Sequence, residues 1–221
     1  MHVVVNAAVS ADGKLSSRRR EQIAISGADD FARVDRLRAE ADAVAVGVGT
    51  VLADDPSLAR HDEAHRADRR GAQPDPPARV VVDSRCRTPT DAAILRGAQE
   101  TYVLTSDAAP GERRESLAAS GATPVAAGAE RVDLPAALGA LEDDGVGHLM
   151  VEGGGELIFS LFEAGLVDEL SVYVGNVVIG GREAPTLADG DGFVADFPAL
   201  DLRSVERVDD GVLLEWTVAG R

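Results

Sequence analysis

Three consecutive glycines, Gly153, Gly154 and Gly155, separate a short apolar run from an amphipathic one. The order strand, glycine turn and helix leaves unpaired backbone N–H groups at a helix N-terminus, where the positive end of the helix dipole also lies. Such a place binds phosphate, because glycine lets ligand oxygens approach the backbone without meeting a Cβ. A glycine turn that binds no ligand explains the same pattern, and this stretch alone does not separate the two interpretations.

Three other segments follow predicted strands in the same way: Gly49-Thr50, Asp83-Ser84 and Gly180-Gly181. In open α/β sheets ligands bind at the carboxyl ends of the strands, so the agreement among these segments favours a nucleotide site. The glycines come too late in the chain for the fingerprint of a Rossmann domain. No Gly-Lys-Ser/Thr follows them, so the segment is not a P-loop either.

The elements that must position these residues alternate along the chain. Apolar runs predict strands at residues 2–9, 43–48, 79–83, 101–105, 123–126, 149–151 and 168–174. Helical periodicity predicts helices over residues 29–41, 111–120, 133–143 and 156–162. Residues 202–208 and 212–218 alternate around Asp209-Asp210-Gly211, which predicts a hairpin. We therefore expect one α/β domain over residues 1–221, a three-layer αβα arrangement with a mostly parallel sheet and a C-terminal antiparallel hairpin.

Several local expectations follow from the same patterns. In the first helix, Asp29 and Asp30 are expected as the N-cap and first-turn acids, with an apolar face of Phe31, Val34, Leu37 and Ala41. Residues 51–58 are expected to form a turn, and the charged, proline-rich residues 60–78 a long surface loop. Asp12 and Lys14 are expected to shape the turn after the first strand, with Gly13 in a left-handed conformation.

The composition excludes several classes of protein. Asp and Glu number 38 against 22 basic residues, a net charge of −16, which argues against nucleic acid or an anionic membrane as a partner. Lys14 is the only lysine, which favours adaptation to a high-salt cytoplasm over an ordinary acidic protein. Cys86 is the only cysteine, so we expect no intrachain disulfide, no metal cluster and a reducing cytoplasm. No apolar run approaches the length of a membrane span, and the N-terminus does not read as a signal peptide.

Taken together, the motifs resemble those of the riboflavin-biosynthesis reductases. The matching segments are Asn6–Lys14, Leu37–Ala39, Gly47–Leu58, Val82–Ser84, Glu152–Gly155 and Ile179–Gly181. The resemblance implies a dihydrofolate-reductase-like fold and a nicotinamide cofactor, usually NADPH. The implied reaction reduces the ribosyl group of a ribosylaminopyrimidinone 5′-phosphate to ribityl. Asn6 replaces the lysine of fused bacterial relatives, and no deaminase domain is expected before residue 1. Both points imply the free-standing archaeal or fungal type, which acts on 2,5-diamino-6-ribosylamino-4(3H)-pyrimidinone 5′-phosphate.

The resemblance also implies which residues hold the cofactor. Gly153–Gly155 and the helix that they open would cradle its diphosphate, with Glu156 at the helix start pointing away. Thr50 and Asp54 would contact the cofactor, and Ala8 would let it approach the first strand. Ser84, with Arg85 or Arg87, would hold the 2′-phosphate of NADPH, although NADH stays open. Alternatively, Thr50 and Asp54 only cap a turn. Arg85 and Arg87 could likewise be solvated loop residues without a ligand.

The implied substrate is a phosphate ester, which needs local positive charge in so acidic a protein. Arg38 and His61 are expected to hold its phosphate, with Arg60 as an alternative to His61 and Ser26 as a further donor. Leu58 would pack on the pyrimidine. An ordinary loop histidine is the alternative for His61.

Glu152 is the main catalytic candidate, facing the ribose hydroxyls and helping to protonate the ring oxygen as the ribose opens. Asn6 would form hydrogen bonds in the same region. Alternatively, the Glu152 carboxylate has a structural role and accepts hydrogen bonds from backbone N–H groups of the glycine turn. The sequence does not assign a single general acid.

Two further functions stay open. One is a dihydrofolate or pteridine reductase on the same fold, and the other is a nucleotide-binding module without catalysis. A homodimer is expected from the resemblance, and also because a bare apolar hairpin with Val212, Leu213, Leu214 and Trp216 would aggregate.

Overall fold

The computed structural model describes residues 1–21 and 23–220. The chain divides into two compact units, one made of Met1 and residues 35–150 and the other of residues 2–34 and 151–221. None of the helices in the described residues combines the length and the hydrophobicity needed to cross a bilayer.

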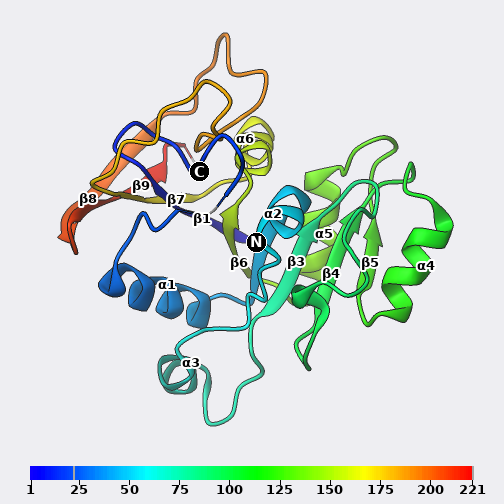
Figure 1. Cartoon of the computed structure of the whole chain (residues 1–221). Helices are drawn as coiled ribbons and strands as arrows, with labels where there is room; N and C mark the ends of the chain where they lie inside the picture. Colours follow the sequence, from blue (N-terminus) through cyan, green and yellow to red (C-terminus); the bar gives the residue numbers. More distant parts are fainter. Residues whose placement is uncertain (22, 221) are drawn as a thin grey trace. The chain divides into compact units, whose positions relative to one another are not determined.

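The first unit is built on parallel strands in the order β5-β4-β3-β2 (Figure 1). Their bounds are β2 Ala43–Gly47, β3 Ala78–Val82, β4 Thr101–Thr105 and β5 Thr123–Ala126. Strand β6, His148–Gly153, begins in this unit and follows β2 in the strand order. Every residue of β2 and β4 is buried, as the unbroken apolar runs predict for strands covered on both faces.

The helices of the first unit are α2 Val48–Asp54, α3 Glu63–Arg70, α4 Gly111–Ala119 and α5 Leu134–Asp143, with a 3-10 turn at Ala93–Leu95. Helix α5 begins as predicted. The Asp133 carboxylate caps it by accepting a 3.0 Å hydrogen bond from the N–H of Ala136, and Pro135 lies in its first turn.

The predicted turn over residues 51–58 is wrong, because α2 already begins at Val48 and includes Thr50 and Asp54. Val48 and Val51 are one helical turn apart, and both are buried in the core of this unit. Asp55 ends the helix in the left-handed conformation, with a φ of 42°. The helix has only two buried positions, Val48 and Val51, and one such i,i+3 pair is too short a pattern to distinguish a helix from a turn.

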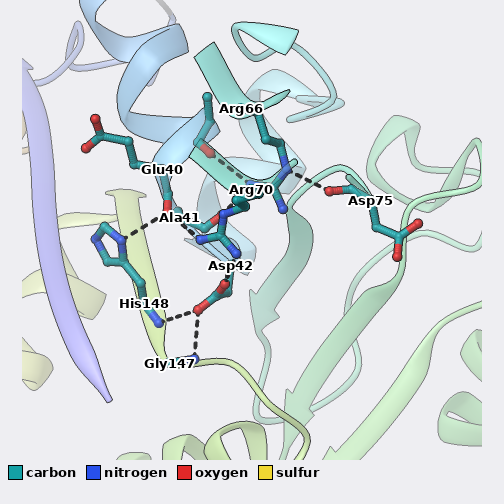
Figure 2. A network of polar contacts seen from close by, with 9 residues as sticks. Glu40, Ala41, Asp42, Arg66, Arg70, Asp75, Gly147 and His148 are labelled. Atoms are coloured by element: carbon teal, nitrogen blue, oxygen red, sulfur yellow. Dashed lines mark hydrogen bonds and ion pairs between the residues drawn. The ribbon is translucent and has the colours of Figure 1, made fainter. Parts of the chain in front are cut away.

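The predicted surface loop over residues 60–78 is also wrong, because it contains α3. The Asp62 carboxylate caps this helix by accepting a 2.9 Å hydrogen bond from the N–H of His65. Arg66, only 4% exposed, donates to the carbonyl oxygens of Ala39 at 2.9 Å, Ala41 at 2.7 Å and Asp75 at 2.6 Å (Figure 2). Burial lowers its pKa. A charged side chain thus attaches α3 to the rest of the unit.

Asp42 connects the beginnings of β2 and β6 in the same network (Figure 2). One of its carboxylate oxygens accepts hydrogen bonds from the N–H groups of Gly147 at 2.9 Å and His148 at 2.7 Å, and the other pairs with Arg70. Burial opposes the ionisation of Asp42, but the hydrogen bonds from Arg70 and His148 outweigh it and lower its pKa.

The second unit has its strands in the order β1-β7-β9-β8. Their bounds are β1 His2–Val9, β7 Glu169–Val174, β8 Leu200–Val208 and β9 Gly211–Val218. Strands β1 and β7 are parallel, whereas β9 runs antiparallel to both β7 and β8. The predicted hairpin is therefore confirmed. The strand at the end of the order is β8, so the apolar residues of β9 lie between two neighbours.

Helix α6, Gly155–Glu163, follows β6 and buries Leu157, Ile158 and Leu161 as predicted, but it also buries Phe159 and leaves Phe162, which was expected on the same face, half-buried. Helix α1, Ala28–Glu40, begins in the second unit with Asp29 and Asp30 in its first turn. The Asp209 carboxylate, in the β8–β9 turn, accepts hydrogen bonds from the N–H groups of Asp29 at 3.2 Å and Asp30 at 3.0 Å. The prediction of Asp29 as the N-cap is therefore wrong, because the helix already begins at Ala28 and a residue far along the chain caps it.

The predicted apolar face of α1 is wrong at Phe31, whose side chain is 53% exposed. Its neighbour Asp30 is instead buried, with 2% exposure, and pairs with Arg33 one turn later at 2.8 Å. Because charged residues occupy the inward positions of this turn, Phe31 faces outward.

Candidate active site

Asn6, in the middle of β1, is buried with 6% exposure and lies in a network of polar side chains. Its amide oxygen accepts a 2.8 Å hydrogen bond from Nη2 of Arg33. Ser171 is its register partner on β7 and accepts a 3.1 Å bond from Nη1 of the same arginine. Asp30 Oδ1 accepts from Nε at 2.9 Å and from Nη2 at 2.8 Å. The guanidinium thus joins helix α1 to two adjacent strands.

Ala8 and Ser26 lie close to this region of the second unit. Ala8 is two residues beyond Asn6 on β1, so both side chains face the same side of the sheet. It packs at the edge of a buried cluster of Ile25, Tyr173 and Leu213. Ser26, which is half-buried, follows Ile25 directly in the chain. The second unit therefore brings Ala8 and the segment that carries Ser26 to one face of the sheet.

Gly154 and Gly155 are glycines for different structural reasons. Gly154 is the N-cap of α6 at φ 95° and ψ 97°, a conformation that favours glycine, and it offers no side chain to cap the helix. Gly155 is buried under another loop. Its carbonyl oxygen accepts a 3.0 Å hydrogen bond from the N–H of Asp189, and a Cβ there would lie 2.5 Å from the carbonyl oxygen of Thr186. Packing within the protein thus explains Gly155, whereas Gly154 fits a phosphate cradle.

The residues on either side of these glycines differ in exposure. Glu152 is half-buried near the end of β6, and Gly153, the last residue of that strand, is buried. Glu156 is exposed in the first turn of α6. Their roles stay predictions.

Asp12 and Lys14 shape the turn after β1, as predicted. The Asp12 carboxylate accepts hydrogen bonds from Ser10 Oγ at 2.7 Å and from the N–H of Ile179 at 2.9 Å. Gly13 has a φ of 80°, and Lys14 Nζ donates to the carbonyl oxygen of Ala184 at 3.3 Å. The turn thereby holds the loop that contains the Ile-Gly-Gly segment.

In the first unit, Thr50 and Asp54 both belong to α2. Thr50 is half-buried in the first turn, and Asp54 is the last residue of the helix. Desolvation by neighbouring atoms raises the pKa of Asp54. The adjacent Asp55 contacts the distant 3-10 turn at Ala93–Leu95, since its Oδ1 accepts a 2.7 Å hydrogen bond from the N–H of Ala93.

Arg38, Arg60 and His61 are gathered near Asp35. Arg60 Nε lies 2.7 Å from Asp35 Oδ2, and Arg38 Nη1 lies 3.7 Å from Asp35 Oδ1. Arg38 Nη1 also donates to the carbonyl oxygen of Arg60 at 3.1 Å. His61 Nδ1 lies 3.1 Å from the carbonyl oxygen of Ala59. Two guanidinium groups therefore lie beside one carboxylate here.

Leu58 is placed differently from its predicted role. It is buried in the hydrophobic core of the first unit, with a φ of 49°. Contact with a pyrimidine stays a prediction for this residue.

Ser84 follows β3, and its Oγ accepts a 3.1 Å hydrogen bond from the N–H of Val132. The preceding residue, Asp83, is fully buried and folds the loop, because its Oδ2 accepts bonds from the N–H of Thr88 at 2.7 Å and from Thr88 Oγ1 at 2.8 Å. Arg87, more than half exposed, lies 3.7 Å from the other oxygen of Asp83.

Sequence reasoning missed Asp30, Arg33 and Asp35. Their signal is the i,i+3 spacing of opposite charges, Asp30 with Arg33 and Asp35 with Arg38, along a single helix. On an exposed helix such pairs contribute little, so the spacing by itself does not identify a buried network.

A family model described as the RibD C-terminal domain matches residues 1–214. The chain belongs to this family. It is 46% identical over 212 residues to the 2,5-diamino-6-ribosylamino-4(3H)-pyrimidinone 5′-phosphate reductase of Archaeoglobus fulgidus, covering 95% of this chain and 94% of that protein. It is 42% identical over 221 residues to the reductase of the same name from Methanothermobacter thermautotrophicus, covering 99% of each. The predicted resemblance to the riboflavin-biosynthesis reductases is confirmed.

Among solved structures, RibD of Acinetobacter baumannii superposes with a TM-score of 0.79 at 25% identity. The match covers 99% of this chain and 58% of that one, so this member of the RibD family spans little more than half the length of that bacterial protein. The likeness to RibD confirms the predicted dihydrofolate-reductase-like α/β fold.

Proposed function

We propose that this chain reduces the ribosyl side chain of 2,5-diamino-6-ribosylamino-4(3H)-pyrimidinone 5′-phosphate to the ribitylamino product, with a nicotinamide cofactor, in riboflavin biosynthesis. The observation that carries the proposal is the 46% identity with a reductase of that name over 95% of the chain. We propose that residues 1–221 act as a single reductase domain, because one family model matches nearly all of them.

The residues around the glycines suit a dinucleotide. Gly154 is a helix N-cap at positive φ without a side chain, so it gives a diphosphate oxygen access to the first turn of α6. Gly153, Gly155 and Glu156 complete this segment, with Glu156 turned to solvent. When bound, the cofactor supplies the hydride. The small side chain of Ala8 would let the cofactor approach β1 closely. Thr50 and Asp54 on α2 would offer a hydroxyl and a carboxylate to its polar groups.

Asn6 and Glu152 are the residues proposed to act on the sugar. Asn6 uses its amide oxygen toward Arg33, so its NH2 group is the part that can donate to a sugar oxygen. Glu152 is half-buried and offers a carboxyl group for the ribose hydroxyls and for protonation of the ring oxygen.

Arg38 and His61 are proposed to hold the substrate phosphate, with Arg60 as the alternative to His61 and Ser26 as a further donor. The two guanidinium groups that lie beside Asp35 support this assignment, because arginine is a good donor to phosphate oxygens. Leu58 is proposed to face the pyrimidine, a role that its burial in the core limits to the exposed edge of the side chain.

NADPH is the proposed cofactor in preference to NADH. Ser84 with Arg85 or Arg87 would hold the 2′-phosphate, and both arginines are exposed after β3. Arg87 has Asp83 as a distant ion-pair partner, which leaves its guanidinium available to a phosphate.

We also propose a homodimer that works in a high-salt cytoplasm. Strand β8 ends the strand order and exposes Leu200, Leu202 and Val205, an apolar edge that a second copy would cover. The net charge of −16 with one lysine supports the high-salt setting, and a single buried cysteine supports a reducing one. Light scattering in molar KCl tests the dimer, and a monomer would contradict it.

The deciding experiment follows absorbance at 340 nm in molar KCl with the ribosylaminopyrimidinone phosphate and either NADPH or NADH. We expect oxidation that depends on the substrate and is faster with NADPH. Dihydrofolate is the control substrate. Turnover of dihydrofolate alone would identify a pteridine reductase, and tight cofactor binding without turnover of either substrate would identify a binding module.

A further inference from the structure

The ion pair of the partly buried Arg33 and the buried Asp30 lies next to Asn6 in the second unit. We propose that Arg33, held in place by Asp30, is a positioning residue that fixes the orientation of the Asn6 amide. This inference rests on the proposed function, in which Asn6 acts on the sugar.

Hydrogen-bond chemistry decides which end of the amide faces Arg33. A guanidinium donates hydrogen bonds and accepts none, so the atom of Asn6 that lies 2.8 Å from Nη2 must be the carbonyl oxygen. Without Arg33 the amide could turn over and present its oxygen instead of its NH2 group. The arginine therefore makes Asn6 a donor toward its other neighbours.

The guanidinium itself is held on several sides. Nε and Nη2 donate to Asp30 Oδ1, and Nη1 donates to Ser171 Oγ. Asn6 and Ser171 are register partners on parallel strands, so the planar fork spans two adjacent side chains on one face of the sheet. A lysine, with one compact ammonium group, cannot reproduce this pattern.

Stability does not explain why charges are buried here. A buried ion pair costs desolvation that its attraction only partly returns, and well-packed apolar residues would stabilise the site as well or better. A fully connected polar network instead holds one arrangement of its members. Asp209 extends this arrangement, because it caps α1 at Asp30 from the β8–β9 turn. The network thus fixes Asn6 relative to a helix end and a hairpin.

The first experiment measures steady-state kinetics of Arg33→Lys and of the charge-matched pair Asp30→Asn with Arg33→Met. The charge-matched pair avoids leaving a buried carboxylate without its partner. We expect kcat to fall about 10- to 100-fold in both, as for a misplaced catalytic group, with the KM for the cofactor within about twofold. Arg36→Met, at an exposed position of the same helix, is the control and keeps wild-type kcat. An unchanged kcat in the charge-matched pair would overturn the proposal.

A double-mutant cycle then separates positioning from a general loss of structure. If Arg33 acts through Asn6, adding the charge-matched pair to Asn6→Ala lowers kcat no further than Asn6→Ala alone. Losses that multiply would overturn the proposal, because Arg33 would then act independently of Asn6.

The last measurement does not depend on turnover. The NMR signals of the Asn6 side-chain NH2 group, assigned with Asn6→Ala, should be sharp and dispersed in the wild-type protein and move toward those of a free amide in the charge-matched pair. Unmoved signals would overturn the positioning role. If the wild-type protein fails to reduce the pyrimidinone phosphate, the proposed function fails, whereas the NMR result still reports on Arg33 and Asn6.

Discussion

The carboxylate of Asp12 accepts a 2.7 Å hydrogen bond from the backbone N–H of Gly180, a residue 168 positions away in the chain. The same carboxylate binds Ser10 Oγ and the N–H of Ile179. An Asp-Gly turn that sequence analysis assigned to local shape thus also holds a distant loop of the second unit. The contact depends on a charged carboxylate, so it depends on pH.

The pKa of Asp12 is lowered from 3.8 to about 2, first by the hydrogen bond from Ser10 and then by those from Ile179 and Gly180. A carboxylate whose pKa is depressed in the folded state stabilises that state above its unfolded pKa, and this contribution is lost as the pH falls from 3.8 toward 2. We expect the amide proton of Gly180 to shift in NMR spectra with a midpoint of about 2. Ser10→Ala should raise that midpoint, and an unchanged midpoint would show that Ser10 does not set the pKa.

Replacing Arg66 should lower the free energy of unfolding of the first unit, although hydropathy would class this arginine as a surface residue. Arg66→Met leaves three backbone carbonyl oxygens without this donor, at Ala39, Ala41 and Asp75 (Figure 2). The hydrogen bonds to Ala39 and Ala41 are buried, and a buried acceptor without a partner costs about 1–3 kcal/mol, so we expect a loss of roughly 3 kcal/mol in the free energy of unfolding. Urea unfolding at fixed salt measures it.

Arg69 on the same helix is the matched control. It is exposed, and Nη2 lies 3.9 Å from Glu40 Oε1, so Arg69→Met should change the free energy of unfolding by less than about 0.5 kcal/mol. Equal losses for the two variants would mean that the contacts of Arg66 do not hold α3.

The sequence predicts the strands of this protein well but misses the charged helix α3, for one physical reason. The strands are continuous apolar runs, and their burial follows from composition alone, as in β2 and β4. Helix α3 has one fully buried side chain, Arg66, and hydropathy classes arginine as a surface residue. The burial of Arg66 depends on carbonyl groups contributed by other segments, which a local pattern does not contain.

The candidate site shows the same limit. Glycine at 154 is predictable because strand, turn and helix are local, and the structure gives it a φ of 95°. The role of Arg33 is not predictable from periodicity, because its partners Asn6 and Ser171 come from two other strands. Phe31 was expected to face inward because no local signal shows that Asp30 takes the buried position.

Gly154→Ala should separate a cofactor role from a conformational one. Gly154 and Gly165 lie at the two ends of α6, with φ of 95° and 62°, so alanine at either position costs about 1–2 kcal/mol of stability. Only Gly154→Ala should also weaken NADPH binding, by about tenfold or more, because only that end of the helix carries N–H donors. Fluorescence titration measures affinity, and equal affinities for both variants would contradict the cradle.

Arg38→Met should weaken binding of the substrate phosphate. A lost charge-assisted hydrogen bond costs about 1.5–3 kcal/mol, so we expect KM for the phosphorylated substrate to rise roughly 10- to 100-fold. The difference should disappear with the dephosphorylated compound as substrate. Arg36→Met keeps the wild-type KM, since that side chain is exposed on the same helix. A KM that rises equally for both substrates would point to a structural role for Arg38.

Salt should stabilise this protein through its charge. At a net charge of −16, self-repulsion opposes the folded state, and the screening length falls from about 10 Å at 0.1 M to about 3 Å at 1 M salt. We expect the melting temperature to rise by roughly 5–10 °C between 0.1 M and 2 M KCl, which corresponds to about 2–3 kcal/mol for a chain of this size. A variant that neutralises three exposed acids, Glu115→Gln, Glu163→Gln and Asp191→Asn, should gain less from the same salt. An equal gain in both proteins would mean that KCl acts through hydration of apolar surface and not through screening.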